Sequence, residues 1–521
     1  MSRRKLMRVC GLIVLLVVLG TLAVPVHTRA ADPGSVDWAL VHDITNRGID
    51  RFYRLETDAA IQRFDSVTRM APEDPRGYFF KSIVHFSLFA LERDRRHFDA
   101  FMKQSEYVIA VCEQLLDNNE HDVMAKFYLG GIYGYRGMLW QTEGSLIKAV
   151  TEGRRGYLYL EEAVEEKPDL YDAHMGFGLF RYLVAKAPRS LHWMMKLLGI
   201  TPDRDGGLQM LKTAAEKGVY TRNEARLYLA QFLFSEHRQD EAYTYINQLC
   251  DEYPENSLFL MLRANWYQRS GKLDEAMADA LKAAEQNSRR PIRFVENILH
   301  STLGSIYYSR NDFANSQKHY ALYTDAGQNN QSAWSRTWYR IGVAHELSGD
   351  RNAAVAAFAR AKKDNEMWGP MAAYYYRRAQ YSLRHPISGA EADIIRAENE
   401  MNVKAYDTAF RLYTAAVASS GNDVEIRSRA LLGLMQLQYE LKRYQDVEET
   451  SRQLLALQPA EERWVLPHGY FVLGQAYTRM ERPAEARKAF DMVDEYDDYD
   501  YQDRLESRAE DELEKLEKAG E

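Results

Sequence analysis

Small and aromatic residues recur at fixed spacings within the apolar stretches of this chain. The string Leu-Gly-x-x-Tyr occurs at 129–133, 303–307 and 473–477. A second string, an alanine followed four residues later by an aromatic residue, occurs at Ala60/Phe64, Ala354/Phe358 and Ala486/Phe490. In several units, the glycine of the first string or an equivalent small residue lies twelve positions before the alanine of the second string. Gly342, for example, lies twelve positions before Ala354. This fixed offset makes the two strings one repeating unit.

Each repeating unit predicts two helices joined by a turn. Alternation of apolar and polar residues, which is typical of strands, is essentially absent. Prolines that end helices follow the second string at Pro72, Pro168, Pro254 and Pro459, because proline cannot continue the second helix. The pattern therefore predicts an all-α protein built from helical hairpins rather than several globular domains.

Eleven positions carry the small residue of the first helix or its equivalent. They are Gly48, Ser82, Gly130, Gly178, Ala230, Ala264, Gly304, Gly342, Arg396, Gly433 and Gly474. The pattern resembles the tetratricopeptide repeat (TPR) family, whose unit is about 34 residues of helix, turn and helix. The resemblance implies an all-α, right-handed superhelical solenoid of about eleven units, with the first helices lining its concave face. Residues 31–498 are expected to form it, and the charged segment 499–521, with one apolar stripe, to cap it.

Two units carry long insertions between their helices, at about 134–155 and 183–206. The second resembles a narrower group, the inclusion-body-clearance and outer-membrane TPR family, for which protein-interaction and lipid-linked roles are suggested. The resemblance rests on Pro188, Leu197, Gly199, Asp203, Arg204, Gly207 and Leu208. The apolar residues of this second insertion are Trp193, Met194, Met195, Leu197 and Leu198. We expect this segment either to pack across neighbouring units or to contact a lipid or a partner.

The first thirty residues have the layout of a secretory signal. Basic residues from Arg3 to Arg8 precede an apolar run at 9–26, and small residues follow around Ala30. We expect cleavage after Ala30 and a periplasmic or secreted protein. Two alternatives remain: residues 9–26 as an uncleaved inner-membrane anchor, and export through the twin-arginine route.

The net charge of the chain limits the classes of molecule it is expected to bind. The whole chain has a net charge of −8, and without the five basic residues of 1–30 it holds 62 Lys and Arg against 75 Asp and Glu. This acidic balance argues against nucleic acid as a partner.

Cys112 and Cys250 lie several units apart, so we expect two buried thiols rather than a disulfide.

The sequence contains no recognisable catalytic constellation. Its thirteen histidines include no pair three or four residues apart, so we expect no catalytic residues, no metal and no cofactor. The residues expected to face the concave groove are Phe127, Gln231, Phe234, Asn265, Arg269, Tyr308, Arg336, Tyr339, Phe471 and Gln475. Such a mixed polar and aromatic surface is typical of peptide binding. The sequence therefore indicates an exported, non-catalytic scaffold for a protein or peptide partner, with membrane docking through 188–200 as the alternative.

Overall fold

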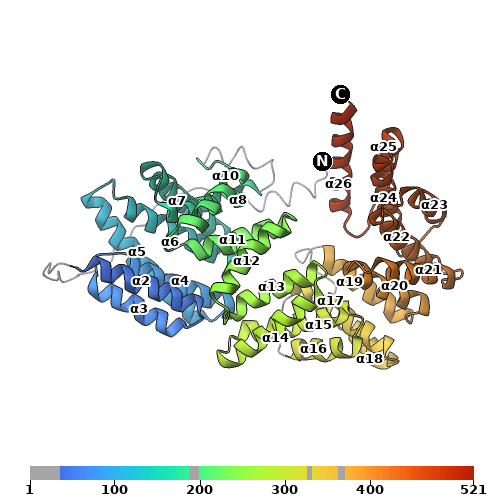
Figure 1. The fold of residues 1–521 in the computed structure, drawn as a ribbon, viewed down its shortest axis with the longest axis horizontal. Coiled ribbons are helices and arrows are strands. Elements are labelled where there is room, and N and C mark those ends of the chain that lie inside the picture. Colours follow the sequence, from blue (N-terminus) through green and yellow to red (C-terminus); the bar gives the residue numbers. More distant parts are fainter. Residues whose placement is uncertain (1–35, 187–198, 326–330, 362–369, 521) are drawn as a thin grey trace. The chain divides into compact units, whose positions relative to one another are not determined.

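The computed structural model describes residues 36–186, 199–325, 331–361 and 370–520. These residues form helices joined by short turns, and no strand occurs in these four ranges (Figure 1). The chain divides into two compact units, residues Met1–Phe259 and Leu260–Glu521. The predicted all-α fold is confirmed.

The helices of the first unit are α2 (Trp38–Tyr53), α3 (Thr57–Met70), α4 (Arg76–Glu92), α5 (Arg95–Asn118), α6 (Val123–Thr142), α7 (Leu146–Glu166), α8 (Tyr171–Ala185), α10 (Arg204–Lys217), α11 (Arg222–Ser235) and α12 (Gln239–Glu252). The boundary between the units falls inside α13 (Ser257–Arg269). The helices of the second unit are α14 (Leu273–Arg289), α15 (Arg293–Ser309), α16 (Phe313–Asp325), α17 (Gln331–Leu347), α18 (Arg351–Phe358), α19 (Pro370–Arg384), α20 (Gly389–Asn402), α21 (Tyr406–Ser419), α22 (Val424–Glu440), α23 (Tyr444–Leu455), α24 (Val465–Arg479), α25 (Pro483–Asp491) and α26 (Gln502–Gly520).

Each of the eleven predicted small-residue positions lies in the first helix of a consecutive pair. The pairs begin with α2, α4, α6, α8, α11, α13, α15, α17, α20, α22 and α24. Among the described helices, α19 and the C-terminal α26 do not belong to this series. The sequence predicts only the unit of Arg396 between those of Gly342 and Gly433, but α19 precedes the pair α20 and α21 there.

The small residue allows the two helices of a pair to approach closely. A Cβ atom added at Gly342 would lie 2.3 Å from a ring carbon of Phe358, the aromatic residue of the same unit. At Gly474 the corresponding distance to the Phe490 ring is 2.7 Å. Both rings are buried. The aromatic ring of the second string therefore packs directly on the glycine of the first string.

The extra residues of the first predicted insertion lengthen two helices. Residues 134–142 continue α6, residues 146–155 begin α7, and only residues 143–145 connect them. At the second insertion, Asp203 caps the N-terminus of α10 by accepting a hydrogen bond from the Gly206 amide at 2.9 Å. Asp203 also forms an ion pair with Arg181, and Arg204 forms one with Glu236 at 2.6 Å. The Asp-Arg pair of the resemblance thus ties α10 to α8 and α11.

The two ends of the first unit meet. The Asn256 side-chain amide donates a hydrogen bond to the Tyr53 carbonyl at 2.7 Å, and Arg54 forms an ion pair with Glu255. The Tyr53 ring also lies 6.1 Å from the Phe259 ring, centroid to centroid. The end of α2 therefore packs against the segment that follows α12, about two hundred residues later in the sequence.

The C-terminal helix covers the last hairpin. Leu505 and Ala509 on α26 are buried and share a hydrophobic cluster with Phe471 and Phe490. The helix contacts both α24 and α25. It thus shields apolar surface that the last repeat would otherwise expose.

Candidate functional site: an aromatic pocket in the first unit

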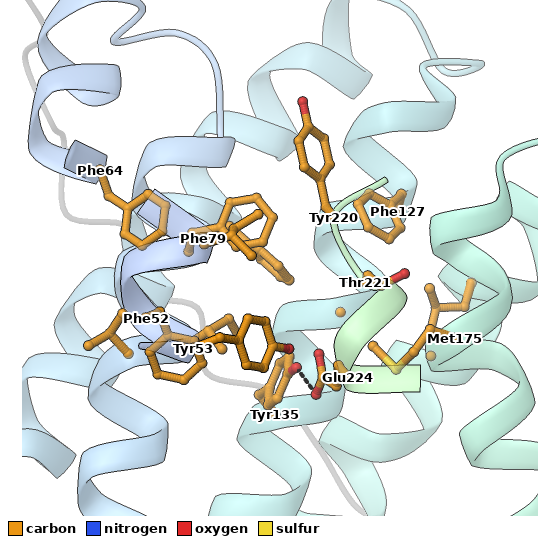
Figure 2. A pocket seen from close by; sticks show the side chains of 17 residues that line it. Phe52, Tyr53, Phe64, Phe79, Phe127, Tyr135, Met175, Tyr220, Thr221 and Glu224 are labelled. Atoms are coloured by element: carbon orange, nitrogen blue, oxygen red, sulfur yellow. Dashed lines mark hydrogen bonds between the residues drawn. The ribbon is translucent and has the colours of Figure 1, made fainter. Parts of the chain in front are cut away.

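A largely apolar pocket lies among the first helices of five successive hairpins. These helices are α2, α4, α6, α8 and α11, and each contacts the next. The pocket is lined by Ile49, Phe52, Tyr53, Phe64, Phe79, Phe80, Ile83, Val84, Phe127, Gly131, Tyr135, Leu160, Met175, Gly176, Tyr220, Thr221 and Glu224 (Figure 2). Its volume is about 40 Å³, which corresponds to roughly three water-sized positions. It can accept the tip of a side chain rather than a whole small molecule.

Two contacts hold α2 in the pocket wall, one near each end of the helix. The link between Asn256 and the Tyr53 carbonyl holds Tyr53 in place, so its ring points toward Glu224 (Figure 2). His42, also on α2, forms a 2.6 Å hydrogen bond with the Tyr220 hydroxyl. The meeting of the unit's two ends therefore builds one side of the pocket.

A buried carboxylate fixes the turn that supplies Tyr220 and Thr221. Asp172 Oδ1 accepts hydrogen bonds from the backbone amides of Val219, Tyr220 and Thr221 at 2.9, 2.8 and 2.9 Å. The Thr221 hydroxyl donates to the same oxygen at 2.9 Å. Because Asp172 belongs to α8 and the turn leads into α11, this group positions Glu224 one turn into the next helix.

Glu224 is the only acidic residue among those lining the pocket, and none of them is basic. The Tyr135 hydroxyl donates a 2.5 Å hydrogen bond to Glu224 Oε1 (Figure 2). Burial raises the pKa of the Glu224 carboxyl to about 7, although the hydrogen bond from Tyr135 favours the ionised form. Near neutral pH the pocket therefore holds a carboxyl group that is ionised about half of the time.

The pocket chemistry fits the binding of a cationic group. The quadrupole of an aromatic ring gives its faces a negative potential that attracts cations, and a carboxylate adds a full opposite charge. The Tyr135 and Tyr53 rings belong to the wall that surrounds Glu224. A group with an apolar stem and a positively charged tip matches both features of this wall.

Half of the predicted groove residues are buried rather than exposed. Phe127, Phe234, Tyr308, Tyr339 and Phe471 are buried, with exposed fractions from 3% to 7%, so they do not line an open surface. Their rings pack on other rings: Tyr339 on Phe358 at 5.9 Å and Phe471 on Phe490 at 5.6 Å, for example. Of the ten predicted residues, only Phe127 lines the pocket of the first unit.

The other predicted groove residues are more accessible. Gln231, Asn265 and Arg269 are exposed, while Arg336 and Gln475 are half-buried. A role in binding stays a prediction for all ten. The apolar residues Trp193, Met194, Met195, Leu197 and Leu198 lie outside the described residues, and their predicted contact also stays a prediction.

The described residues also show where the cysteines lie, whether side chains gather to hold a metal and how apolar the helices are. Cys112 and Cys250 are both buried, as expected. Across the described ranges, no group of three or more His, Cys, Asp and Glu side chains is placed to hold a metal ion. None of the helices described is long and apolar enough to cross a lipid bilayer.

The chain consists mainly of consecutive helical hairpins that pack through small residues, and a pocket lies among the first helices of the hairpins in the first unit. These features define a helical-repeat protein, a class that serves as protein-interaction scaffolds. Residues 172–379 match the family model described as Iml2/Tetratricopeptide repeat protein 39. This match supports a tetratricopeptide repeat protein, and the helical hairpins have the tetratricopeptide repeat fold. The match is consistent with the narrower resemblance seen around residues 188–208, which it contains.

Several solved structures match this chain over most of their own length. Human IFIT1, solved as a dimer with PPP-AAAA, is 13% identical over 88% of this chain and 95% of that chain, with a TM-score of 0.33. Yeast Tom70 is 14% identical over 86% and 99%, with a TM-score of 0.29. A TPR protein from Parabacteroides merdae is 12% identical over 55% and 98%, with a TM-score of 0.24. At these values none supports a functional argument, and no curated protein matches the sequence.

Proposed function

We propose that this chain is an exported, non-catalytic scaffold that binds a segment of a partner protein, and that the pocket of the first unit receives a lysine or arginine side chain. The observation that supports this proposal is Glu224: an acidic group among aromatic walls, with no basic residue lining the same pocket. The TPR fold is typical of protein-interaction scaffolds.

The pocket accounts for selectivity between cationic and neutral side chains. A cation placed against Glu224 favours the ionised carboxylate, which burial disfavours in the free protein. The flexible aliphatic stem of lysine or arginine covers apolar wall while its charged tip reaches the carboxylate. A neutral side chain of similar size gains only the apolar contact, so the acidic residue provides the discrimination.

Binding is expected to depend on pH through Glu224. With a pKa of about 7, the ionised fraction of Glu224 rises about tenfold between pH 6 and pH 8, so affinity for a cationic segment should rise by about the same factor. Peptides selected from a random library at pH 8 supply the ligands, and isothermal titration at both pH values measures their affinity. We expect the Glu224→Gln variant to lose this rise, because glutamine keeps the hydrogen-bond acceptor for Tyr135 but carries no charge.

The matched control is Glu216→Gln on α10, an exposed glutamate of the same unit that lies outside the pocket and outside the predicted groove. It should select and bind the same peptides as the wild-type chain. Selection of identical peptides by the Glu224→Gln variant, with the same pH profile as the wild type, would remove the proposed role of the pocket. Absence of lysine and arginine from the selected peptides would do the same.

Export is the part of the proposal that depends on the leader sequence. The basic residues before the apolar run 9–26 and the small residues around Ala30 support it. Mass spectrometry of the protein from its native envelope is expected to find Ala31 as the first residue, and Ala30→Arg should block cleavage. An intact residue 1–30 segment in the membrane fraction of the wild type would instead support the anchor, and full-length protein in the cytosolic fraction would contradict export.

A further inference from the structure

A second pocket, of different chemistry, lies in the second unit between the last hairpin and the C-terminal helix. It is lined by His468, Tyr501, Arg504, Leu505 and Arg508, and its volume is about 250 Å³. His468 belongs to α24, and the other residues belong to α26 or to the turn before it. The pocket is therefore large enough for a small polyatomic ion or for the end of a longer ligand.

The two arginines stand out from the other basic residues of the C-terminal helix. Lys515 and Lys518 on the same helix form ion pairs with Glu512 and Glu514 at 2.7 and 2.6 Å. Arg504 and Arg508, one helical turn apart, form no ion pair with any of the described residues. None of the residues lining the pocket is acidic, so the wall that holds the two arginines contains no carboxylate.

The surroundings of the pocket hold these cations in place. The Arg508 guanidinium carbon lies 4.4 Å from the centre of the Phe471 ring, so the ring supports one face of the group. Burial and the charge of Arg504 lower the pKa of Arg508, while the charge of Glu512 on the same helix raises it. An arginine guanidinium stays charged in proteins at neutral pH. The neighbouring positive charges repel one another, and a bound anion would relieve this repulsion.

The remaining polar groups are compatible with an anion. Burial lowers the pKa of His468 to about 4, so the ring is neutral at pH 7 and adds no charge of its own. Its Nδ1 donates a 2.8 Å hydrogen bond to the Trp464 carbonyl, which fixes the ring. The Tyr501 side chain also lines the pocket, and its hydroxyl is a hydrogen-bond donor.

We infer that this pocket binds an oxyanionic group, a carboxylate or a phosphate, between Arg504 and Arg508. The planar guanidinium fork matches the geometry of both groups and forms paired, charge-assisted hydrogen bonds with them. The site lies in a different unit from the Glu224 pocket and does not depend on the function proposed for that pocket.

Titration of the full chain with inorganic phosphate and with succinate, at constant ionic strength, tests the inference. We expect saturable binding of at least one of the two anions, and a loss of about tenfold or more in affinity for both Arg504→Gln and Arg508→Gln. Binding of phosphate alone assigns a phosphate group to the site, and binding of succinate alone assigns a carboxylate.

Two variants keep the test independent of folding. Arg504 is exposed, so Arg504→Gln should leave the circular dichroism spectrum unchanged even if Arg508→Gln disturbs the packing on Phe471. The control is Arg487→Gln on α25, whose side chain is exposed and pairs with Glu517 at 3.2 Å, and which should bind the anion like the wild type. Unchanged affinity in Arg504→Gln, or no saturable binding of either anion up to about 10 mM, overturns the inference.

Discussion

Replacing Glu462 by glutamine is expected to lower the free energy of unfolding of the second unit by about 3 to 5 kcal/mol, because it removes one charge from a buried ion-pair network. Glu462 and Arg378 are each about 1% exposed and form an ion pair. Arg378 also pairs with Glu391, which is equally buried and accepts a 2.9 Å hydrogen bond from Arg429. Without the Glu462 charge, two buried arginines share the one remaining buried carboxylate.

The network joins separate helices, which explains the size of the expected effect. Arg378 lies on α19, Glu391 on α20 and Arg429 on α22, while Glu462 lies in the segment between α23 and α24. Hydrogen exchange of α19, α20 and α22, combined with urea unfolding of the full chain, measures the loss. The control is Glu461→Gln, the neighbouring residue, whose carboxylate pairs with the exposed Arg384 and should contribute about 0 to 1 kcal/mol. Equal effects of the two variants would contradict the network's role.

Acid should reduce the difference between the wild type and Glu462→Gln. Burial opposes ionisation of Glu462, but Arg378, Arg429 and Arg377 together lower its pKa to about 2. A carboxyl pKa that is lower in the folded chain than in the unfolded chain stabilises the fold above the unfolded pKa of 4.5. This stabilisation is lost as the pH falls from about 4.5 toward 2, so the stabilities of the two proteins should converge over that range.

The second large effect is expected at a close helix crossing in the first unit. A Cβ atom at Gly207 on α10 would lie 2.7 Å from the Gly178 carbonyl oxygen and 2.8 Å from the Tyr182 amide nitrogen on α8. These are backbone atoms, so no side-chain rotation relieves the clash. Gly207→Ala should therefore cost about 1 to 3 kcal/mol of unfolding free energy, and Gly207→Val more. Urea unfolding, with hydrogen exchange of α8 and α10, measures the cost.

The same substitution at Gly153 is the matched control. Gly153 lies inside α7 of the same unit, and an added Cβ atom would make an ordinary 3.7 Å contact with the Phe180 ring. Since alanine is about 0.5 to 1 kcal/mol better than glycine inside a helix, Gly153→Ala should leave the unit as stable or more stable. If Gly207→Ala were also neutral, α8 and α10 would not depend on the close approach.

The repeat pattern predicted the hairpins because each depends on residues near one another in sequence. Gly342 and Phe358 belong to one unit, and the ring of Phe358 packs closely on Gly342. The sequence spacing of these two residues is enough to indicate their contact. The interruption by α19 was not predicted, because that helix lacks the Leu-Gly-x-x-Tyr string. Its alanine and aromatic residue at the repeat spacing, Ala372 and Tyr376, have Arg360 instead of a small residue twelve positions before the alanine. Local periodicity thus identifies each pair of helices but not an extra helix between two pairs.

The pocket could not be predicted in the same way. Tyr53, Tyr135 and Glu224 come from three different hairpins. Tyr53 and Tyr135 share one repeat position, five residues after Gly48 and Gly130, but Glu224 lies six residues before Ala230. The repeat spacing therefore does not indicate that the carboxylate meets the two rings. The prediction of groove residues assumed an open concave face. Aromatic side chains instead pack between neighbouring helices, and this buries residues such as Tyr308 and Tyr339 that were expected to be exposed.

The contact between α2 and the segment after α12 also determines how the first unit responds to a change in repeat number. A linear repeat array tolerates the gain or loss of a hairpin, because each repeat contacts only its neighbours. In the first unit, Tyr53 contacts Asn256, and the hairpins between these two residues complete a closed ring of helices. The number of hairpins therefore sets the size of this ring. Deleting one hairpin would leave a gap in this closed circuit, and the wall around Glu224 would open with it. The first unit should therefore evolve by substitution inside its hairpins rather than by duplication or loss of whole repeats.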